Sequence, residues 1–444
     1  MSAATNQAPL RNDELKGRAR LTAVEDRILA CVHCGFCLSV CPTYTRLGDE
    51  ADSPRGRILL MRAVEEGRLS TEDPYFHKHI DQCVGCRACE PVCPSGVQYG
   101  LLLERARATI TDTVGSSVPT RVLLWSFSND WARAVVGFAG RLFRSTGLPR
   151  WLARRLPKRM NRVRFMFAML ATTTPWRGLQ RITRGESKLR TAEGVAGSRR
   201  PVVAMLDGCA QDAFFPHVNR ATAEVLEANA CAVLRVSNQG CCGALHAHRG
   251  QIDRARELAK RNIASFQASG AERVIVNAAG CAAVMKEYGE LLEDDPQWGE
   301  RAREFSRSVR DISEFLMEIG PVEGEPVPVR VTWDAPCHLC HAQRIVQAPI
   351  DLLDSIPQLE HVPLDHADEC CGGAGIYGLL HEELGGRILA DKVNAILRTG
   401  ADVVASANPG CIMQIGAGMI LQGRDVPVVH VVELLAESYR RRAE

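Results

Sequence analysis

The sequence lacks the features of a membrane-spanning or secreted chain. No run of eighteen apolar residues occurs in its 444 residues, and the first thirty are polar and mixed in charge, without the apolar stretch of a signal peptide. Lys and Arg (54) nearly balance Asp and Glu (52), so the net charge of +2 gives no general case for binding nucleic acid. These absences predict a cytoplasmic, non-spanning globular protein of two to four domains.

Motifs for nucleophilic or phosphate chemistry are also missing. There is no Ser-His-Asp elbow and no phosphate loop, and the histidines do not form a metal-binding set. His33, His338 and His341 lie beside cysteines, where histidine more often supports a ligand than acts as one. The dinucleotide-like pattern from Gly373 to Gly378 directly follows a cysteine pair, and a lone match of this kind is weak. The cysteines are therefore the main candidates for chemistry.

Eighteen cysteines in a large chain without a signal peptide point to metal or redox chemistry rather than disulfides. Two groups share the spacing C-x2-C-x2-C-x3-C-P of bacterial ferredoxins, in which three thiolates bind one [4Fe-4S] cluster and the fourth binds the other. By this crossover rule, one cluster takes Cys31, Cys34, Cys37 and Cys93, and the second takes Cys41, Cys83, Cys86 and Cys89. Gly35 and Gly85 lie inside the loops, where the lack of a Cβ lets backbone N–H groups approach the cluster sulfurs.

Structural zinc is the alternative for these eight cysteines, because two C-x2-C pairs can form a tetrahedral sulfur site. Zinc requires neither a third C-x2-C step nor a proline after the fourth cysteine. Here Pro42 and Pro94 occupy that place in both groups. The pattern favours two neighbouring [4Fe-4S] clusters, and it predicts a helical, ferredoxin-like domain over residues 1–110.

The remaining cysteines contain a duplication. The interval from Cys209 to Cys241 is 32 residues and that from Cys241 to Cys281 is 40. The later intervals, from Cys337 to Cys370 and on to Cys411, are 33 and 41 residues. Each copy also contains a Cys-Cys-Gly motif, called CCG below, at the same offset of about 129 residues. The sequence predicts two copies of one cysteine-rich domain, over 201–322 and 323–444.

In each copy the cysteines follow short β-branched runs. The expected strands are 201–206, 232–236 and 273–276 in the first copy and 327–332, 361–364 and 401–405 in the second, with helices over 251–268 and 379–398. Alternating strands and helices predict a parallel sheet, and ligands gather at the carboxyl edge of such sheets. The predicted fold class is α+β and multi-domain, with a helical two-cluster ferredoxin-like domain followed by two duplicated α/β domains.

The repeated cysteines form two candidate sets for additional clusters or redox sites. The first set is Cys209, Cys241, Cys242 and Cys281, and the second is Cys337, Cys340, Cys370, Cys371 and Cys411. A packing or turn role for the CCG pairs is the alternative, but it does not explain why cysteine recurs at three matching positions. Cys231 lies in a strand-like run and is expected to be simple core packing.

The segment over 111–200 is predicted to be a basic amphipathic linker or docking segment. From Trp131 to Gly185 it has no Asp or Glu but thirteen Lys or Arg, interleaved with Trp, Phe, Leu and Met. The stretches 131–143 and 150–169 have the pattern of basic helices that lie on an anionic membrane surface, which would place residues 131–185 against the inner face of the cell membrane. A docking arm against a partner subunit or the chain's own clusters fits equally well. A solvated linker fits less well, because it needs few large apolar residues.

The N-terminal motifs resemble those of the iron-sulfur subunit of bacterial glycolate oxidase, a glycolate dehydrogenase. The matching segments are Cys31 to Tyr44, 48–50, 54–57, 277–281, 334–343, 370–377 and 408–414, so the resemblance covers nearly the whole chain apart from the basic middle. It implies an electron-transfer subunit. Flavin-binding partner subunits, which carry FAD, would oxidise a 2-hydroxy acid, with glycolate to glyoxylate as the leading case. This chain would then pass the electrons to a quinone or another acceptor.

The cysteine-rich copies also resemble the catalytic subunit of heterodisulfide reductase, which would make them a site of disulfide reduction fed by the two clusters. That family has C-x-x-C at the third position of the motif, whereas this chain has Ala278 and Asn408 in place of the first cysteine. The sequence leaves open whether the copies bind clusters, reduce a disulfide or act as a scaffold for partner subunits. Similar subunits of lactate and glycerol-3-phosphate dehydrogenases leave the substrate open as well.

Overall fold

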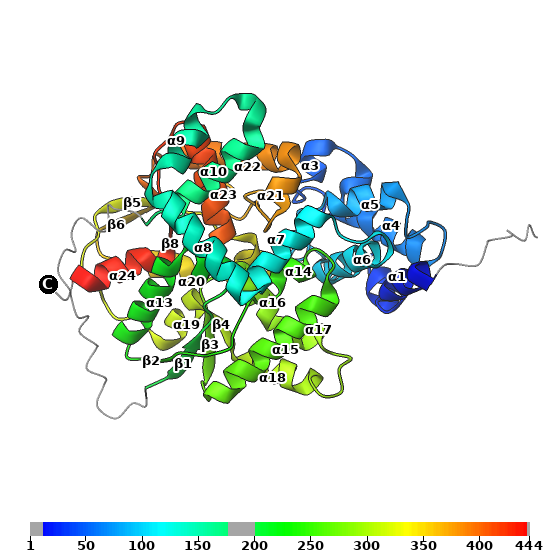
Figure 1. Ribbon diagram of the computed structural model, residues 1–444, viewed down its shortest axis with the longest axis horizontal. Helices are drawn as coiled ribbons and strands as arrows, with labels where there is room; N and C mark the ends of the chain where they lie inside the picture. Colours follow the sequence, from blue (N-terminus) through cyan, green and yellow to red (C-terminus); the bar gives the residue numbers. More distant parts are fainter. Residues whose placement is uncertain (1–11, 176–199, 442–444) are drawn as a thin grey trace, which may run out of the picture. The chain divides into compact units, whose positions relative to one another are not determined.

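The computed structural model describes residues 12–175 and 200–441, and the chain divides into two compact units (Figure 1). Unit 1 contains the residues up to Arg121 together with Leu245–Ile252, and unit 2 contains Val122–Ala244 and the residues from Asp253 onward. In the described part of the chain, no helix is long and apolar enough to cross a membrane.

Unit 1 is helical. Its elements are α1 (Asn12–Thr22), α2 (Glu25–Leu29), α3 (Tyr44–Leu47), η1 (Glu50–Asp52), α4 (Pro54–Glu65), α5 (Pro74–Asp81) and α6 (Tyr99–Val114). The first cysteine loop lies between α2 and α3, and the second lies between α5 and α6. The Ser53 hydroxyl caps α4 by accepting a hydrogen bond from the Gly56 N–H, and Pro54 occupies the first turn, where its missing N–H costs nothing. Buried residues such as Met61, Phe76 and Leu102 hold these helices together.

Residues 245–252 come from the middle of the first cysteine-rich copy but pack within unit 1. Arg107 donates to the His248 carbonyl at 2.8 Å, and the His248 ring pairs with Glu104 at 3.0 Å. Arg249 pairs with Asp81 at 2.8 Å. Side chains of α5 and α6 therefore fix this segment in unit 1.

Unit 2 contains two parallel sheets of four strands each. The first comprises β1 (Val202–Met205), β2 (Ala232–Leu234), β3 (Arg273–Val276) and β4 (Val309–Asp311), in the order β2-β1-β3-β4. The second comprises β5 (Val329–Trp333), β6 (Leu359–Val362), β7 (Val403–Ser406) and β8 (Val428–His430), in the order β6-β5-β7-β8. The identical strand order and the helical unit 1 confirm the predicted α+β fold class with a duplicated α/β domain.

Helices follow the strands in both copies. The first copy contains α12 (Ala210–Phe214), α13 (Pro216–Ala228), α14 (Ala244–Ala247), α15 (Ile252–Ser269), α16 (Ala279–Lys286), α17 (Tyr288–Leu291), α18 (Gly299–Ser308) and α19 (Ile312–Ile319). The second contains η3 (His338–Ala342), α20 (Ala348–Asp354), α21 (Tyr377–Leu380), α22 (Glu382–Thr399), α23 (Pro409–Leu421) and α24 (Val431–Arg441). The copies meet at the starts of α16 and α23, because the Ala279 N–H donates to the Ala407 carbonyl at 3.0 Å.

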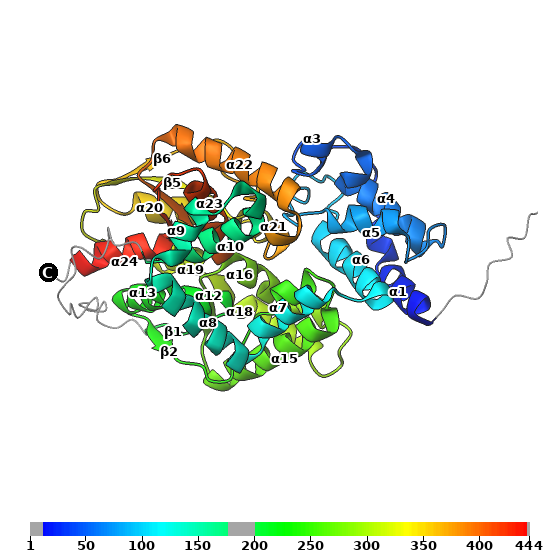
Figure 2. The same cartoon turned by 45° about the horizontal axis from the view of Figure 1, so that its top comes forward.

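The basic middle segment forms α7 (Val118–Ser128), α8 (Asp130–Ser145), α9 (Leu148–Arg155) and α10 (Asn161–Thr172). The predicted helix over 131–143 lies inside α8. The stretch 150–169 is not one helix, because it breaks at the extended Leu156 that precedes Pro157, and a 3-10 turn, η2 (Lys158–Met160), follows before α10. α10 packs against α9 and α23 (Figure 2). The part of the basic segment from Trp176 to Gly185 lies outside the described residues.

Several arginines of this segment form hydrogen bonds or ion pairs within unit 2. Arg141 donates to the Ala213 carbonyl at 2.6 Å and Arg144 to the Phe214 carbonyl at 3.1 Å, which fastens α8 to α12. Arg162 of α10 pairs with Glu382 at 2.8 Å. The segment is therefore docked on the cysteine-rich copies of its own chain.

Candidate metal centres

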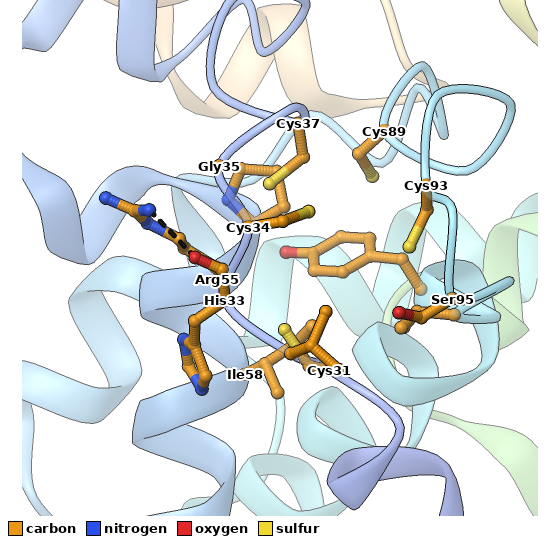
Figure 3. A pocket seen from close by; sticks show the side chains of 14 residues that line it. Cys31, His33, Cys34, Gly35, Cys37, Arg55, Ile58, Cys89, Cys93 and Ser95 are labelled. Atoms are coloured by element: carbon orange, nitrogen blue, oxygen red, sulfur yellow. Dashed lines mark hydrogen bonds between the residues drawn. The ribbon is translucent and has the colours of Figure 1, made fainter.

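The first cysteine set of unit 1 surrounds a cavity (Figure 3). The cavity is lined by Cys31, Cys34, Cys37 and Cys93, with Cys89 and Tyr99 also on its wall. Gly35 has a φ of 90°, in the left-handed region that favours glycine. The Arg55 guanidinium holds the loop by donating to the His33 carbonyl at 3.2 Å. The structure thus brings together the four cysteines that the crossover rule groups.

The second set of unit 1 lines its own cavity. Its walls include Cys41, Cys83, Cys86 and Cys89, together with Thr43, Arg57 and Tyr99. The Tyr99 hydroxyl donates to Cys83 Sγ at 3.5 Å, and the Gly85 N–H donates to the same sulfur at 3.4 Å. Thr43 Oγ1 lies 3.2 Å from Cys41 Sγ. The expected backbone donor at Gly85 is therefore present, and two hydroxyl groups lie beside the sulfurs.

A buried cation beside this second set was missed by the sequence reasoning. Arg57 is 0% exposed and donates to Thr43 Oγ1 at 3.0 Å, to Asp52 Oδ1 at 3.1 Å and to the His79 carbonyl at 2.6 Å. Burial by itself lowers the pKa of Arg57, but Cys83, Tyr99, Cys41 and Asp52 outweigh it and raise the pKa above its usual value. Arg57 therefore stays charged. Gly56 makes this packing possible, because a Cβ there would lie 1.9 Å from the Glu50 carbonyl oxygen.

In unit 1, the spacing of the cysteine sulfurs fits a group larger than one zinc ion. Zinc holds four sulfurs at about 2.3 Å, which places them about 3.8 Å from one another. Among the described residues, the one group of three or more His, Cys, Asp or Glu ligand atoms all within 4.8 Å of one another is Asp49, Asp52 and His79. Asp52 in that group is already bonded to Arg57 and His79. In unit 1, no three described cysteine sulfurs gather as closely as in a closed zinc site, and such all-thiolate sets suit iron-sulfur clusters.

The cysteines of the first cysteine-rich copy meet at the carboxyl edge of its sheet. Cys209 precedes α12, the CCG pair follows β2, and Cys281 lies in the first turn of α16. Cys209 Sγ and Cys241 Sγ are 3.5 Å apart, and Cys242 contacts Cys281. The hydrogen bond with Cys209 lowers the pKa of Cys241, but Cys242 and burial outweigh it and raise the pKa to about 12. Thiolates at this set therefore need a metal to stabilise them.

The second copy repeats this arrangement. Cys337 precedes η3, Cys370 and Cys371 follow β6, and Cys411 lies in the first turn of α23, where its Sγ is 3.4 Å from Cys371 Sγ. Cys337 contacts Cys370 and lies 3.5 Å from His338 Nδ1. Cys340 Sγ instead lies near the carbonyls of Ala335 and Cys337, at 3.8 and 3.9 Å.

The second copy has a buried charge pair that the first lacks. Lys392 Nζ lies 3.2 Å from Asp334 Oδ1, and both side chains are almost fully buried. The corresponding residues of the first copy are Asn262 and Leu206. Hydrogen bonds from Cys370 and Cys411, with the charge of Lys392, hold the pKa of Cys371 well below its usual value. Lys392 therefore places a buried positive charge beside the second set, where the first copy has Asn262.

Cys231 belongs to neither set. It packs in the hydrophobic core of unit 2, and its Sγ faces the Asn229 carbonyl at 3.7 Å. Burial raises the pKa of its thiol to about 11. This agrees with the expected packing role.

Comparison with known protein families defines the class. The model described as "4Fe-4S dicluster domain" matches residues 27–97, and the model described as "Cysteine-rich domain" matches residues 203–286 and 331–416. The chain is thus an iron-sulfur protein with a dicluster domain and two cysteine-rich domains.

Relatives that match along nearly their whole length identify the family within this class. The chain is 37% identical over 432 residues to the probable glycolate oxidase iron-sulfur subunit of Bacillus subtilis (strain 168), covering 93% of this chain and 94% of that protein. It is 33% identical over 438 residues to the glycolate oxidase iron-sulfur subunit of Escherichia coli (strain K12), covering 97% and 98%. Lactate utilization protein A of Exiguobacterium sp. (strain ATCC BAA-1283 / AT1b) is 31% identical over 243 residues, covering 54% of this chain and 99% of that protein. The chain belongs to the family of glycolate oxidase iron-sulfur subunits, which confirms the resemblance and the predicted role as an iron-sulfur component of an oxidoreductase complex.

Proposed function

We propose that this chain transfers electrons in a complex that oxidises a 2-hydroxy acid, with glycolate to glyoxylate as the leading reaction. The oxidation itself is assigned to FAD-binding partner subunits. The observation that carries the proposal is the pair of cysteine-lined cavities in unit 1, which share Cys89 and Tyr99 in their walls. Two centres so close to each other suit the passage of single electrons.

The proposed ligand sets are those of the crossover rule. Cys31, Cys34, Cys37 and Cys93 would hold one [4Fe-4S] cluster, and Cys41, Cys83, Cys86 and Cys89 would hold the other. When bound, each cluster stores and releases one electron. The chain's own residues tune this exchange, because Tyr99 and the Gly85 N–H donate to Cys83 and the Arg57 cation lies nearby. Hydrogen bonds and positive charge both stabilise the reduced form.

The function is tested by reduction of the clusters, followed by EPR spectroscopy on anaerobic samples. We expect glycolate to reduce this chain only when the flavin subunits are present, and the isolated chain to stay oxidised. Lactate and glycerol 3-phosphate, assayed in parallel, identify the substrate. The proposal fails if neither glycolate nor lactate reduces the clusters of the complex, or if the isolated chain reacts with glycolate directly.

We further propose that each cysteine set of unit 2 binds an additional iron-sulfur cluster. Support comes from the sulfurs that meet at each sheet edge and from the recurrence of cysteine at matching positions of both copies. The disulfide-reductase alternative has less support, because Asn408 takes the place of the missing cysteine and is used to join the two copies: its Oδ1 accepts from the Gly280 N–H at 3.2 Å. We expect Cys241→Ser and Cys370→Ser each to lower iron per chain, and Cys231→Ser, the matched buried control, to leave it unchanged. Equal iron in all three variants would refute the assignment and favour a scaffold role.

Peripheral contact with an anionic membrane is proposed for α8 to α10. The outer face of α8 exposes Trp131 (73%) and Phe138 (64%), while its inner face is buried against the chain. Arg155, Lys158 and Arg159, around η2, are exposed and have no ionic partner among the described residues. Apolar side chains next to uncompensated cations are typical of helices that lie on anionic lipid.

The membrane proposal is tested by sedimentation with vesicles of phosphatidylglycerol and phosphatidylcholine. We expect the double variant Trp131→Glu, Phe138→Glu to lose binding and high salt to weaken it. Met317→Glu, which changes a 36% exposed residue of α19, serves as the control and should bind normally. If the double variant instead binds vesicles normally and loses the flavin subunits, α8 is a docking face for those partners.

A further inference from the structure

We propose that a lipophilic quinone binds in a cavity of unit 2 formed by α10, α21, α22 and α23, where it would take up the electrons of the second cysteine set. This inference rests on the proposed electron-transfer function and names the acceptor and its site. The cavity has a volume of about 190 Å³. Its lining is mainly apolar, with Phe165 of α10, Leu379 of α21, Leu389 and Val393 of α22 and Leu421 of α23. A cavity of about 150 Å³ with such a lining is known to accept a benzene ring, so a quinone ring is of suitable size.

One buried amide faces this cavity. Gln414 of α23 lines it and is only 2% exposed, and its side chain forms no hydrogen bond with any described residue. The corresponding residue of the first copy, three positions after Cys281, is Val284. Because this side chain lines the cavity, its amide is available to a ligand that can accept a hydrogen bond there. A quinone carbonyl accepts such a bond from Gln414 Nε2 and needs no charge in the protein.

The amide lies next to the second cysteine set. Gln414 is one helical turn beyond Cys411. A Cβ added to Gly373 would lie 3.2 Å from the Gln414 Cβ and 3.4 Å from the Cys371 Sγ. A Cβ on Gly378 would lie 2.8 Å from Gln414 Oε1. The glycines of this pattern therefore make room for the Gln414 side chain, and the ligand in the cavity would be a close neighbour of the cysteines.

The lining fits a lipophilic acceptor better than a nucleotide. The cavity has one cationic residue, Arg162, and this side chain is paired with Glu382 at 2.8 Å. A dinucleotide needs several donors for its phosphates, and the described lining does not offer them. On the neighbouring surface of α10, Val163 and Met166 are 37% and 57% exposed. A quinone dissolved in a membrane would reach the cavity from such a surface.

The number of electrons that the quinone takes up equals the number that the proposed oxidation releases. Oxidation of the C–OH group of a 2-hydroxy acid to C=O releases two electrons and two protons. The quinone takes up two electrons, one at a time from this chain, and two protons from water at the exposed rim by Asn161 and Arg162. Both of its C=O groups become C–OH groups. Gln414 holds one carbonyl in place and transfers no proton, so it is a positioning residue.

The test blocks the cavity without disturbing the fold. Gly386 of α22 lines the cavity, and a Cβ there would meet no atom within 4 Å. Gly386→Leu therefore adds a side chain at the cavity wall, and it replaces a poor helix former inside a helix. Gln414→Val removes the donor by introducing the residue type of the first copy. Arg256→Leu, at the matching position of α15, is the control because it creates the same leucine on the first copy.

Steady-state kinetics of the purified complex with glycolate and decylubiquinone give the readout. We expect the KM for decylubiquinone to rise at least tenfold in Gly386→Leu and in Gln414→Val, and to change less than twofold in Arg256→Leu. Iron content and the EPR spectrum of the dithionite-reduced protein should match the wild type in all three. An unchanged KM in both cavity variants overturns the proposal.

A second measurement separates failure of the site from failure of the proposed function. A photoreactive azidoquinone is added to the purified chain, and labelled peptides are identified by mass spectrometry. We expect label in 382–399 or 409–421, displaced by decylubiquinone and lost in Gly386→Leu. Label elsewhere, or label that persists in this variant, overturns the site. If neither glycolate nor lactate reduced the clusters of the complex, the proposed function would be refuted instead, and the labelling result would still decide the site.

Discussion

Replacing Arg57 should lower the reduction potential of the second cluster of unit 1 and leave the first almost unchanged. Arg57 Nη1 is 3.0 Å from Thr43 Oγ1, which is 3.2 Å from Cys41 Sγ, so the cation lies within about 6 Å of a ligand sulfur. At an effective dielectric constant of about 20, two unit charges at this distance interact by roughly 2–3 kcal/mol. That energy corresponds to about 100 mV for one electron, and the opposite charge of Asp52 offsets part of it. We therefore expect Arg57→Gln to shift the potential by roughly −50 to −100 mV.

The assay is an EPR-monitored redox titration that follows the two cluster signals separately. Arg57→Gln also leaves Asp52 buried without its cation, which costs about 3–5 kcal/mol and can weaken cluster retention. Arg57→Lys keeps the charge and should give a smaller shift. Arg55→Gln is the matched control two residues earlier on α4, because Arg55 borders the first cavity and is partly exposed, so solvent screens its charge. Equal potentials in Arg57→Gln and the wild type would refute the electrostatic role of Arg57.

Two further predictions concern packing and pH. Gly56→Ala should cause loss of iron from unit 1, because the new Cβ would lie 1.9 Å from the Glu50 carbonyl oxygen. The measurement is iron per chain after anaerobic purification, and an unchanged iron content would contradict the prediction. Burial raises the pKa of Glu433 to about 7, above its unfolded value, so this carboxyl favours the folded state at acid pH and loses that effect as the pH rises through 7. Glu433→Gln should therefore raise Tm at pH 8 and leave it nearly unchanged at pH 5. Burial lowers the pKa values of the neighbouring His217 and His430 to about 3 and about 4, so these two groups destabilise the fold at acid pH in the wild type and in Glu433→Gln alike. A Tm gain at pH 5 alone would contradict the prediction.

Local patterns in the sequence predicted the cysteine groups and the parallel sheets. The cysteines of each ferredoxin group are separated by only two or three residues, so their spacing predicted both groups, and the crossover rule placed Cys93 with Cys31, Cys34 and Cys37. Three strands of each sheet were expected because β-branched runs precede the cysteines. Strands β4 and β8 were missed because each has only three residues and leads directly into a helix, α19 or α24, whose apolar pattern hides it.

The residues that tune the sites were not predicted, because their roles arise from tertiary burial. Arg57, Lys392 and Gln414 are distant in sequence from most of the groups that they face. A signal does exist for two of them. Lys392 and Gln414 are polar residues within the apolar faces of α22 and α23, and a polar residue at such a position requires a partner or a ligand.

We propose that unit 1 holds two [4Fe-4S] clusters bound by crossed cysteine sets. The most direct test of this proposal is the iron, acid-labile sulfide and zinc content of anaerobically purified protein, measured with EPR after dithionite reduction. We expect equal iron and sulfide, at least about eight of each per chain, no zinc, and two magnetically interacting signals. We also expect Cys93→Ser to remove the same signal as Cys34→Ser. Zinc without sulfide, or different signals lost in these two variants, would contradict the proposal.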